Sequence, residues 1–145
     1  MSGGYLLDTS VLSRFAPGRP DASSELREWM RDHGAAEALF ISSMTIAEIE
    51  KGVCKLERQG AAAKSKQVRA WLEGIVATFE DRILPMDTAT AVLAGAIEDA
   101  AVGRGRNPGL ADVIIAATAQ RSGLTVVTDN VRHFEELAVP FERPV

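Results

Sequence analysis

The segment 109–130 places an acidic residue in a strongly apolar helix and follows that helix at once with an apolar strand. It reads G-L-A-D-V-I-I-A-A-T-A-Q-R-S-G-L-T-V-V-T-D-N. The pattern predicts a helix over 110–120 and a strand over 124–127. Asp112 lies near the start of the helix, and Asp129 follows the strand. An ionised acid in such surroundings costs several kcal/mol unless a partner compensates its charge, so the segment requires a partner for Asp112.

The rest of the chain alternates short apolar runs with amphipathic helical patterns. Strands are predicted at 5–7, 39–41 and 83–84, with a final strand at Phe141. Helices are predicted over 11–15, 26–33, 46–56, 68–79, 88–102 and 130–137. Pro85 follows the third strand and removes a backbone donor, so that strand is expected at a sheet edge. Short strands alternating with helices indicate an α/β sandwich around a mostly parallel sheet.

Length and composition limit the class of protein. With 145 residues, the chain is expected to form a single domain over 1–145. No apolar run approaches the roughly 18 residues of a membrane span, and the first residues lack the pattern of a signal peptide. The single Cys, Cys54, fits the reducing cytoplasm, so we expect a cytoplasmic protein without a membrane partner. The net charge of −4 argues against a general nucleic-acid binder. The placement of the charged residues matters more for this question than their total.

Four acidic residues stand at junctions between predicted elements: Asp8, Glu48, Asp112 and Asp129. Each has a structural explanation when taken alone. Asp8 could cap the helix that follows the first strand. Glu48 lies three residues after Thr45, the spacing of a helix capping box, and Asp112 could favour the positive end of its helix. The acid after the last long strand could form an ordinary turn with Asn130.

Together the four acids predict a divalent-cation site. In an open parallel sheet, ligands bind outside the carboxyl ends of the strands, where the strand order reverses. Asp8 and Asp129 end strands, while Glu48 and Asp112 lie in the first turns of helices that start at the same edge. Clustered carboxylates repel one another unless a cation neutralises them. Oxygen ligands without a Cys or His cluster suit Mg²⁺ or Mn²⁺, and such a site can hydrolyse a phosphodiester.

Basic residues lie beside these acids in the sequence. Lys51, Lys55 and Arg58 share one face of the helix that carries Glu48, and Arg104 precedes the apolar helix. A solvated surface explains any one of these groups. Their position beside the acidic edge also predicts contact with the phosphates of an RNA backbone.

The remaining reactive residues are given structural roles. Cys54 has no nearby sequence partner and is expected to be a small core or surface residue. His33 and His133 lie near predicted helix ends, where the helix dipole explains them. The sequence G-R-G-R at 103–106 lacks the Lys-Ser/Thr of a phosphate-binding loop.

Five motifs in the chain resemble the PIN-domain family, specifically toxins of the VapC/FitB type. They are L-L-D-T-S-V-L at 6–12, I-S-S-M-T-I-A-E-I-E-K-G at 41–52, R-I-L-P-M-D at 82–87, A-D-V-I-I-A-A-T-A at 111–119 and T-V-V-T-D-N-V-R-H-F at 125–134. The resemblance implies a Mg²⁺- or Mn²⁺-dependent ribonuclease on a Rossmann-like α/β/α sandwich. Asp8, Glu48 and Asp112 match the acidic positions of the family.

The fourth acidic position of the family usually follows a Thr by two residues. Counted from Thr128, that position is Asn130, and Asp129 stands one residue earlier. We expect either side chain to complete the metal shell, directly or through water. Ser10 or Thr9 is expected to hydrogen-bond a ligand or the scissile phosphate.

The resemblance assigns roles and partners as follows. Asp8 and Asp112 would be the principal metal ligands, and Glu48 would orient the attacking water or complete a second metal site. Lys51, Lys55 and Arg104 are the expected contacts to the RNA substrate. The implied assembly is a homodimer bound to a cognate VapB/FitA-like antitoxin whose tail fills the acidic cleft, in a hetero-oligomer that binds promoter DNA.

Three alternative functions remain open at the level of sequence. A haloacid-dehalogenase-like phosphatase also begins with an Asp after its first strand, but Ser10 occupies the place of its second Asp. A receiver domain needs an acceptor Asp after its third strand, and Asp87 lies behind Pro85 there. A PIN-fold binding module, or an antitoxin-bound regulator associated with DNA and without nuclease activity, is the third alternative.

Overall fold

Five parallel strands form the centre of the molecule. The computed structural model describes residues 3–19 and 22–145; Met1 and Ser2, part of the stretch in which no signal peptide is expected, lie outside the described residues. The strands are β1 (Tyr5–Leu7), β2 (Leu39–Ser42), β3 (Ile83–Leu84), β4 (Thr125–Val127) and β5 (Phe141–Glu142). Their order across the sheet is β3-β2-β1-β4-β5, and each of the four neighbouring pairs is parallel. The predicted α/β class and the edge position of β3 are confirmed.

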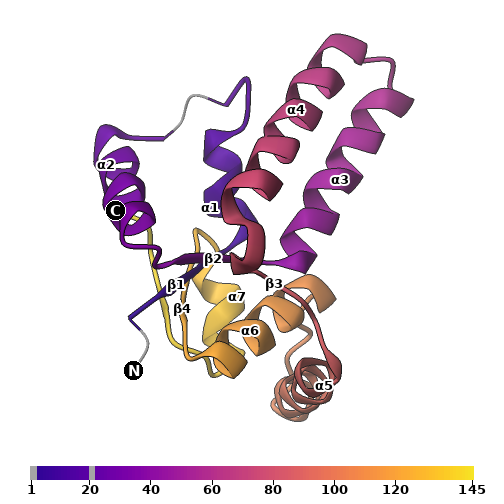
Figure 1. The fold of residues 1–145 in the computed structure, drawn as a ribbon. Helices are drawn as coiled ribbons and strands as arrows, with labels where there is room; N and C mark the ends of the chain where they lie inside the picture. Colours follow the sequence, from indigo (N-terminus) through magenta and orange to yellow (C-terminus); the bar gives the residue numbers. More distant parts are fainter. Residues whose placement is uncertain (1–2, 20–21) are drawn as a thin grey trace.

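Helices cover both faces of the sheet (Figure 1). They are α1 (Thr9–Leu12), α2 (Ser24–Ala35), α3 (Ser43–Arg58), α4 (Ala62–Phe79), α5 (Thr88–Gly103), α6 (Leu110–Ser122) and α7 (Val131–Glu135), with short 3-10 turns η1 (Ser13–Phe15) and η2 (Glu80–Arg82). Helices α3 and α4 form a long hairpin on one side of the sheet, and α5 and α6 lie on the other (Figure 1). Within the described part of the chain, no helix is both long and apolar enough to span a bilayer.

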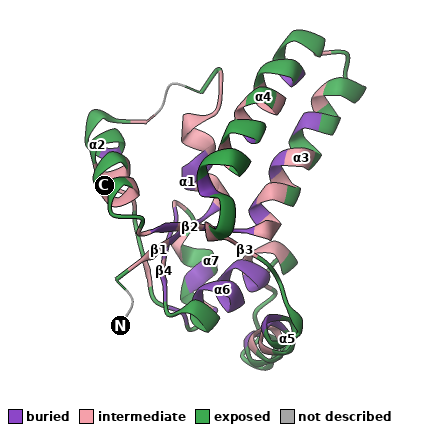
Figure 2. Cartoon of the chain, viewed as in Figure 1, coloured by how far each residue is buried: buried purple, intermediate pink, exposed green. Residues whose placement is uncertain are grey.

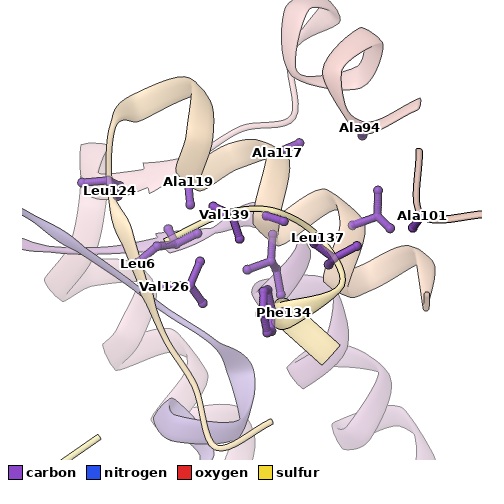
Figure 3. Packing of buried hydrophobic residues seen from close by; sticks show 13 residues of the cluster. Leu6, Ala94, Ala101, Ala117, Ala119, Leu124, Val126, Phe134, Leu137 and Val139 are labelled. Carbon is purple, nitrogen blue, oxygen red and sulfur yellow. The ribbon is translucent and has the colours of Figure 1, made fainter. Parts of the chain in front are cut away.

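The two faces of the sheet carry separate hydrophobic cores because successive side chains of a strand point to opposite faces. Leu6 and Val126 pair across β1 and β4 and pack into the core beneath α5, α6 and α7 (Figure 3). Leu7 and Val127, the next pair, enter the core beneath α1 to α4. Residues 113–119 of α6 are all buried, and Figure 2 shows this helix as the most deeply covered in the molecule. The apolar sequence of α6 therefore reflects burial on every side of the helix.

Helix α3 begins differently from the prediction. Ser42 is its N-cap, and the Ser42 hydroxyl accepts a hydrogen bond of 3.0 Å from the backbone N–H of Met44. Thr45 therefore lies inside the first turn and is fully buried, so the capping-box interpretation of Thr45 and Glu48 is wrong. Because Glu48 does not cap its helix, its carboxylate is available for another partner.

Gly4, just before β1, is packed so closely that a side chain there would force its neighbours to move. A Cβ atom at this position would lie 2.8 Å from Leu124 Cδ2, 3.1 Å from Phe40 Cε1 and 3.2 Å from the carbonyl oxygen of Ala38. We expect Gly4→Ala to lower the free energy of unfolding by about 1–3 kcal/mol, the usual effect of overpacking. The matched control is Gly74→Ala in the exposed middle of α4, where a Cβ meets nothing within 4 Å. That variant should gain about 0.5–1 kcal/mol in urea unfolding, and equal effects of the two changes would contradict the packing.

Candidate active site

The carboxyl edge of the sheet collects the candidate residues because the strand order reverses there. The chain runs outward from β1 to β2 and β3 and then returns to place β4 on the other side of β1. Asp8 follows β1 and Asp129 lies two residues after β4, on either side of this switch point. Helices α3 and α6 both begin at the same edge, which brings Glu48, in the second turn of α3, and Asp112, in the first turn of α6, toward Asp8.

Asp8 is the most buried acid of the site, with 3% of its surface exposed. Its Oδ2 accepts hydrogen bonds from Ser10 Oγ at 2.7 Å and from Thr128 Oγ1 at 2.8 Å. Asp8 occupies the N-cap position of α1, but its side chain makes no capping bond, so the capping interpretation is wrong. Both side-chain bonds fall on Oδ2, and no described residue donates to Oδ1. One carboxylate oxygen of Asp8 is therefore available to a ligand.

Glu48 and Asp112 are electrostatically coupled to Asp8. Glu48 Oε1 accepts a hydrogen bond of 2.6 Å from Thr9 Oγ1. Burial is the main cause that raises the pKa of Glu48, and the charges of Asp8 and Asp112 raise that pKa further. Burial also raises the pKa of Asp112, with the charge of Asp8 as the second cause. Neighbouring carboxylates therefore destabilise the charged forms of Glu48 and Asp112, as expected for acids that share a site.

His133 contacts the candidate ligand Asp112. Its Nδ1 lies 2.8 Å from Asp112 Oδ2, and the side chains are 59% and 21% exposed. This contact opposes the rise in the pKa of Asp112. The helix-end role given to His133 from the sequence missed this contact, because 21 residues separate the two side chains along the chain. No local spacing identifies such a pair.

Asp129 is bound to a residue that sequence reasoning did not single out. Arg14 donates from Nε to Asp129 Oδ2 at 3.0 Å and from Nη2 to Asp129 Oδ1. The backbone N–H of Asp129 donates to Ser10 Oγ at 3.2 Å. Asn130 is exposed, and its backbone N–H donates to Thr128 Oγ1 at 2.8 Å. The fourth acid is thus paired with a guanidinium, whereas no described Lys or Arg forms an ion pair with the other three.

The donor chemistry of the site fits a divalent cation, although the present arrangement does not assemble a complete shell. Asp8, Glu48 and Asp112 supply hard oxygen ligands, which Mg²⁺ and Mn²⁺ prefer. Within residues 3–19 and 22–145, no three His, Cys, Asp or Glu side chains are placed to hold a metal ion together. The physical reason is that each carboxylate turns to its own protein donor: a hydroxyl, an imidazole or a guanidinium. A bound cation would replace part of these contacts and remove the mutual repulsion.

The basic residues predicted to bind substrate have different surroundings. Lys51 is exposed, and its charge lowers the pKa of Glu48, so it lies near the acidic site. Lys55 is exposed on the next turn of α3. Arg104 instead donates from Nη2 to the carbonyl oxygen of Glu136, which ties the loop after α5 to the end of α7. Lys51 and Lys55 remain the better candidates.

A groove of about 280 Å³ leads along the α3–α4 hairpin to Glu48. Thr9 and Glu48 line it together with Arg19, Lys64 and Trp71. A larger cavity, about 470 Å³, lies elsewhere, at the amino edge of the sheet among residues such as Gly4, Ala38 and Leu124, and none of the four acids lines it. The groove, rather than the larger cavity, therefore connects a candidate active-site residue, Glu48, with the surface of the α3–α4 hairpin.

Comparison with known proteins gives one consistent result. The family described as PIN domain matches residues 5–140. The chain is 35% identical to Toxin FitB of Neisseria gonorrhoeae over 130 residues, which cover 89% of each protein. It is 30% identical to the tRNA(fMet)-specific endonuclease VapC of Salmonella typhimurium, covering 92% of this chain and 91% of that protein.

Solved structures agree with the sequence comparison. The crystal structure of FitAcB from Neisseria gonorrhoeae superposes with a TM-score of 0.82 at 32% identity, covering 97% of both chains. The structure of DNA-bound VapBC from Salmonella typhimurium gives a TM-score of 0.80 at 26% identity over the whole of both chains.

The raised pKa of Asp112 predicts that its charge destabilises the metal-free fold. In the pH window between the ordinary carboxyl pKa and the raised value, the folded protein binds more protons than the unfolded chain. Stability therefore falls as pH rises through that window, and the loss persists at neutral pH. We expect Asp112→Asn to raise the melting temperature in EDTA at pH 7.5, by about 2–4 °C for each kcal/mol gained.

Thermal melts of Asp112→Asn as a function of pH test this expectation. The gain should shrink as the pH falls toward the ordinary carboxyl value, where the native acid is protonated as well. The control is Asp99→Asn, an exposed acid on α5, whose effect should depend little on pH. A lower melting temperature for Asp112→Asn at pH 7.5 would show that the charge instead stabilises the fold.

Proposed function

The chain belongs to the PIN-domain family, in its VapC/FitB toxin–antitoxin group, and on that premise we propose that it is a toxin that cleaves RNA with a divalent cation. The observation that carries the proposal is the convergence of Asp8, Glu48 and Asp112 at the switch point of the sheet. The charge of Asp8 raises the pKa of both other acids. Similar proteins that are named as a toxin and as a tRNA(fMet)-specific endonuclease support the same activity.

Asp8 and Asp112 would hold the cation, which we take to be Mg²⁺ or Mn²⁺. When bound, such an ion lowers the pKa of water and neutralises the charge that develops on a phosphodiester. Asp8 would hold the cation through Oδ1, because its Oδ2 accepts hydrogen bonds from Ser10 and Thr128. Ser10 therefore orders Asp8 rather than a substrate atom.

Glu48 would orient the attacking water. The Thr9 hydroxyl holds Oε1 of Glu48 at 2.6 Å, which leaves Oε2 to accept a hydrogen bond from water. Thr9 is in turn fixed by Thr45: the single Thr9 hydroxyl proton goes to Glu48, so Thr9 Oγ1 accepts a 3.0 Å hydrogen bond from Thr45 Oγ1. A carboxylate whose pKa is raised by burial is a better proton acceptor than a solvated one, which suits this role.

The groove along the α3–α4 hairpin would take the RNA strand. It opens at Glu48 and carries the cations Arg19 and Lys64. Lys51 and Lys55 lie on the exposed side of α3, one of the two helices of this hairpin. With a net charge of −4 for the whole chain, this local set of cations would supply the phosphate contacts.

We further propose a cytoplasmic homodimer that is inhibited by a VapB/FitA-like antitoxin and that binds promoter DNA with it. Support comes from similar solved structures, which are described as FitAcB and as DNA-bound VapBC. No described Lys or Arg forms an ion pair with Asp8, Glu48 or Asp112. This acidic edge would therefore accept a cationic residue from the antitoxin tail.

A non-catalytic binding module is the second candidate. It is favoured by one observation: each of the four acids already has a protein donor, and the described side chains form no ready metal cluster. Cleavage assays with Mn²⁺ on a panel of RNAs separate the two candidates, because only a nuclease would yield metal-dependent products.

The chemistry of the product ends tests the proposed mechanism. Attack by water, with the 3′-oxygen leaving, gives 5′-phosphate and 3′-hydroxyl ends, which end-specific ligation or mass spectrometry identifies. Asp112→Asn should lower the cleavage rate by more than about 100-fold, because even indirect changes at metal sites cost 10–100-fold. Asp99→Asn should cleave at the wild-type rate. Cyclic 2′,3′-phosphate ends would point to attack by the ribose hydroxyl and would defeat the mechanism.

Charge reversal on α3 tests the proposed RNA contacts. In an Asp112→Asn background, which prevents cleavage, Lys51→Glu/Lys55→Glu should weaken RNA binding and lower the slope of log K against log salt by about 0.7 for each lost phosphate contact. The control is Arg31→Glu/Lys66→Glu, which makes the same charge change at exposed positions of α2 and α4. If the salt slope stays at the wild-type value, Lys51 and Lys55 do not contact the backbone.

A further inference from the structure

The ion pair between Arg14 and Asp129 joins two segments that are 115 residues apart in the chain. Arg14 lies in η1, just beyond β1, and Asp129 follows β4, the strand that pairs with β1. Two parallel N–H···O bonds connect the guanidinium to both carboxylate oxygens, and the two side chains are 27% and 30% exposed. Such bidentate, charge-assisted bonds are stronger and more directional than neutral ones.

The same segments are joined a second time through Asp8. The backbone N–H of Asp129 donates to Ser10 Oγ at 3.2 Å, and Ser10 Oγ donates to Asp8 Oδ2 at 2.7 Å. Thr128 Oγ1 donates to the same oxygen at 2.8 Å. A continuous set of hydrogen bonds therefore runs from Arg14 through Asp129 and Ser10 to the carboxylate of Asp8. Fixing the backbone at Asp129 fixes the hydroxyl that orients Asp8.

Asp129 is poorly suited to bind a cation in this arrangement. A cation there would compete with Arg14 for the same two oxygens, and displacing Arg14 would leave a partly buried guanidinium without this partner. A cation beside that guanidinium would also be repelled. Glu48 and Asp8 accept hydrogen bonds from neutral hydroxyls, which a cation can displace or leave in place at a smaller cost.

The ion pairs separate Asp129 from the other acids. No described Lys or Arg forms an ion pair with Asp8, Glu48 or Asp112. The Arg14 guanidinium, by contrast, compensates the charge of Asp129.

We propose that Arg14 and Asp129 form a positioning clamp that orients Asp8 through Ser10, and that the metal site of this chain consists of Asp8, Glu48 and Asp112 without Asp129. The proposal rests on the divalent-cation site of the proposed function. Asp129 would then act on the site by orienting Asp8 through Ser10, without contacting the metal. Arg14 would be a further residue on which the site depends.

The test is the Mn²⁺ affinity of the purified chain without RNA, measured by isothermal titration calorimetry for Arg14→Ala, Asp129→Ala and the double variant. A clamp predicts that both single changes weaken Mn²⁺ binding to a similar extent, by about 10-fold, as for other residues that orient metal ligands. The double variant should be no weaker than either single one, because both remove the same contact. If Asp129 is a ligand, Asp129→Ala weakens binding while Arg14→Ala leaves it unchanged or tightens it, which overturns the clamp.

Conservative variants keep the test valid if an alanine variant folds poorly. Asp129→Asn retains an oxygen for Arg14 and the backbone N–H for Ser10, so it should stay within about threefold of wild-type affinity, whereas loss of a ligand costs far more. Ser10→Ala cuts the relay itself and should reproduce the loss seen with Arg14→Ala. The control Arg69→Ala removes another bidentate pair, with Glu50 between α4 and α3, and should leave Mn²⁺ binding unchanged.

The Asp112→Asn variant distinguishes failure of the metal site from failure of the clamp. If wild type binds Mn²⁺ and Asp112→Asn does not, the metal site stands and the Arg14 and Asp129 variants decide the clamp alone. If wild type itself binds no Mn²⁺, the metal site fails and the clamp fails with it. Thermal melts of each variant verify that the chain is folded in the calorimeter.

Discussion

The mutual repulsion of three carboxylates at one edge of the sheet is the constraint around which this molecule is built. Five parallel strands bring their carboxyl ends to the same side, and the return of the chain beside β1 opens the edge at its centre. Asp8, which is buried, lies there beside the half-buried Glu48 and Asp112, and burial together with the charge of Asp8 disfavours the charged forms of these two acids. In the metal-free protein each charge is held by hydroxyls or an imidazole close by. The fold thus keeps a region of negative potential that a cation would relieve.

Helix α6 makes this arrangement possible because it is anchored on every side. Residues 113–119 are buried without interruption between the sheet, α5 and α3, so the helix has little freedom to shift. Asp112 sits in its first turn, where the positive end of the helix dipole partly compensates the carboxylate. A rigid helix holds an acid near Asp8 despite their repulsion, whereas a mobile loop would move it into solvent. The burial of the apolar helix α6 therefore helps to hold the charged residues of the site together.

The sequence predicted those parts of the structure that follow from periodicity and topology. Alternating strands and helices led to the parallel sheet, Pro85 placed β3 at the edge, and the positions of Asp8, Glu48 and Asp112 at element junctions led to their convergence. The start of α3 was not predictable, because Ser42 and Thr45 are both capable caps and only the backbone path selects Ser42. The contacts of His133 and Arg14 were also missed. Their partners lie 21 and 115 residues away, and surface side chains leave no periodic signal.

The fourth position of the site shows why an acidic motif cannot be interpreted without its cations. The sequence T-D-N at 128–130 offers a carboxylate and an amide at adjacent positions, and both could reach a metal by spacing alone. Whether Asp129 does so depends on position 14, far away in the chain, where an arginine matches both of its oxygens. An acid bound in this way can orient the residues around it. It adds little net negative charge to the site, because the guanidinium already compensates its charge. In our proposal, the number of ligands at such a site follows from the balance of acids and guanidinium groups, which would leave three acids for a cation here.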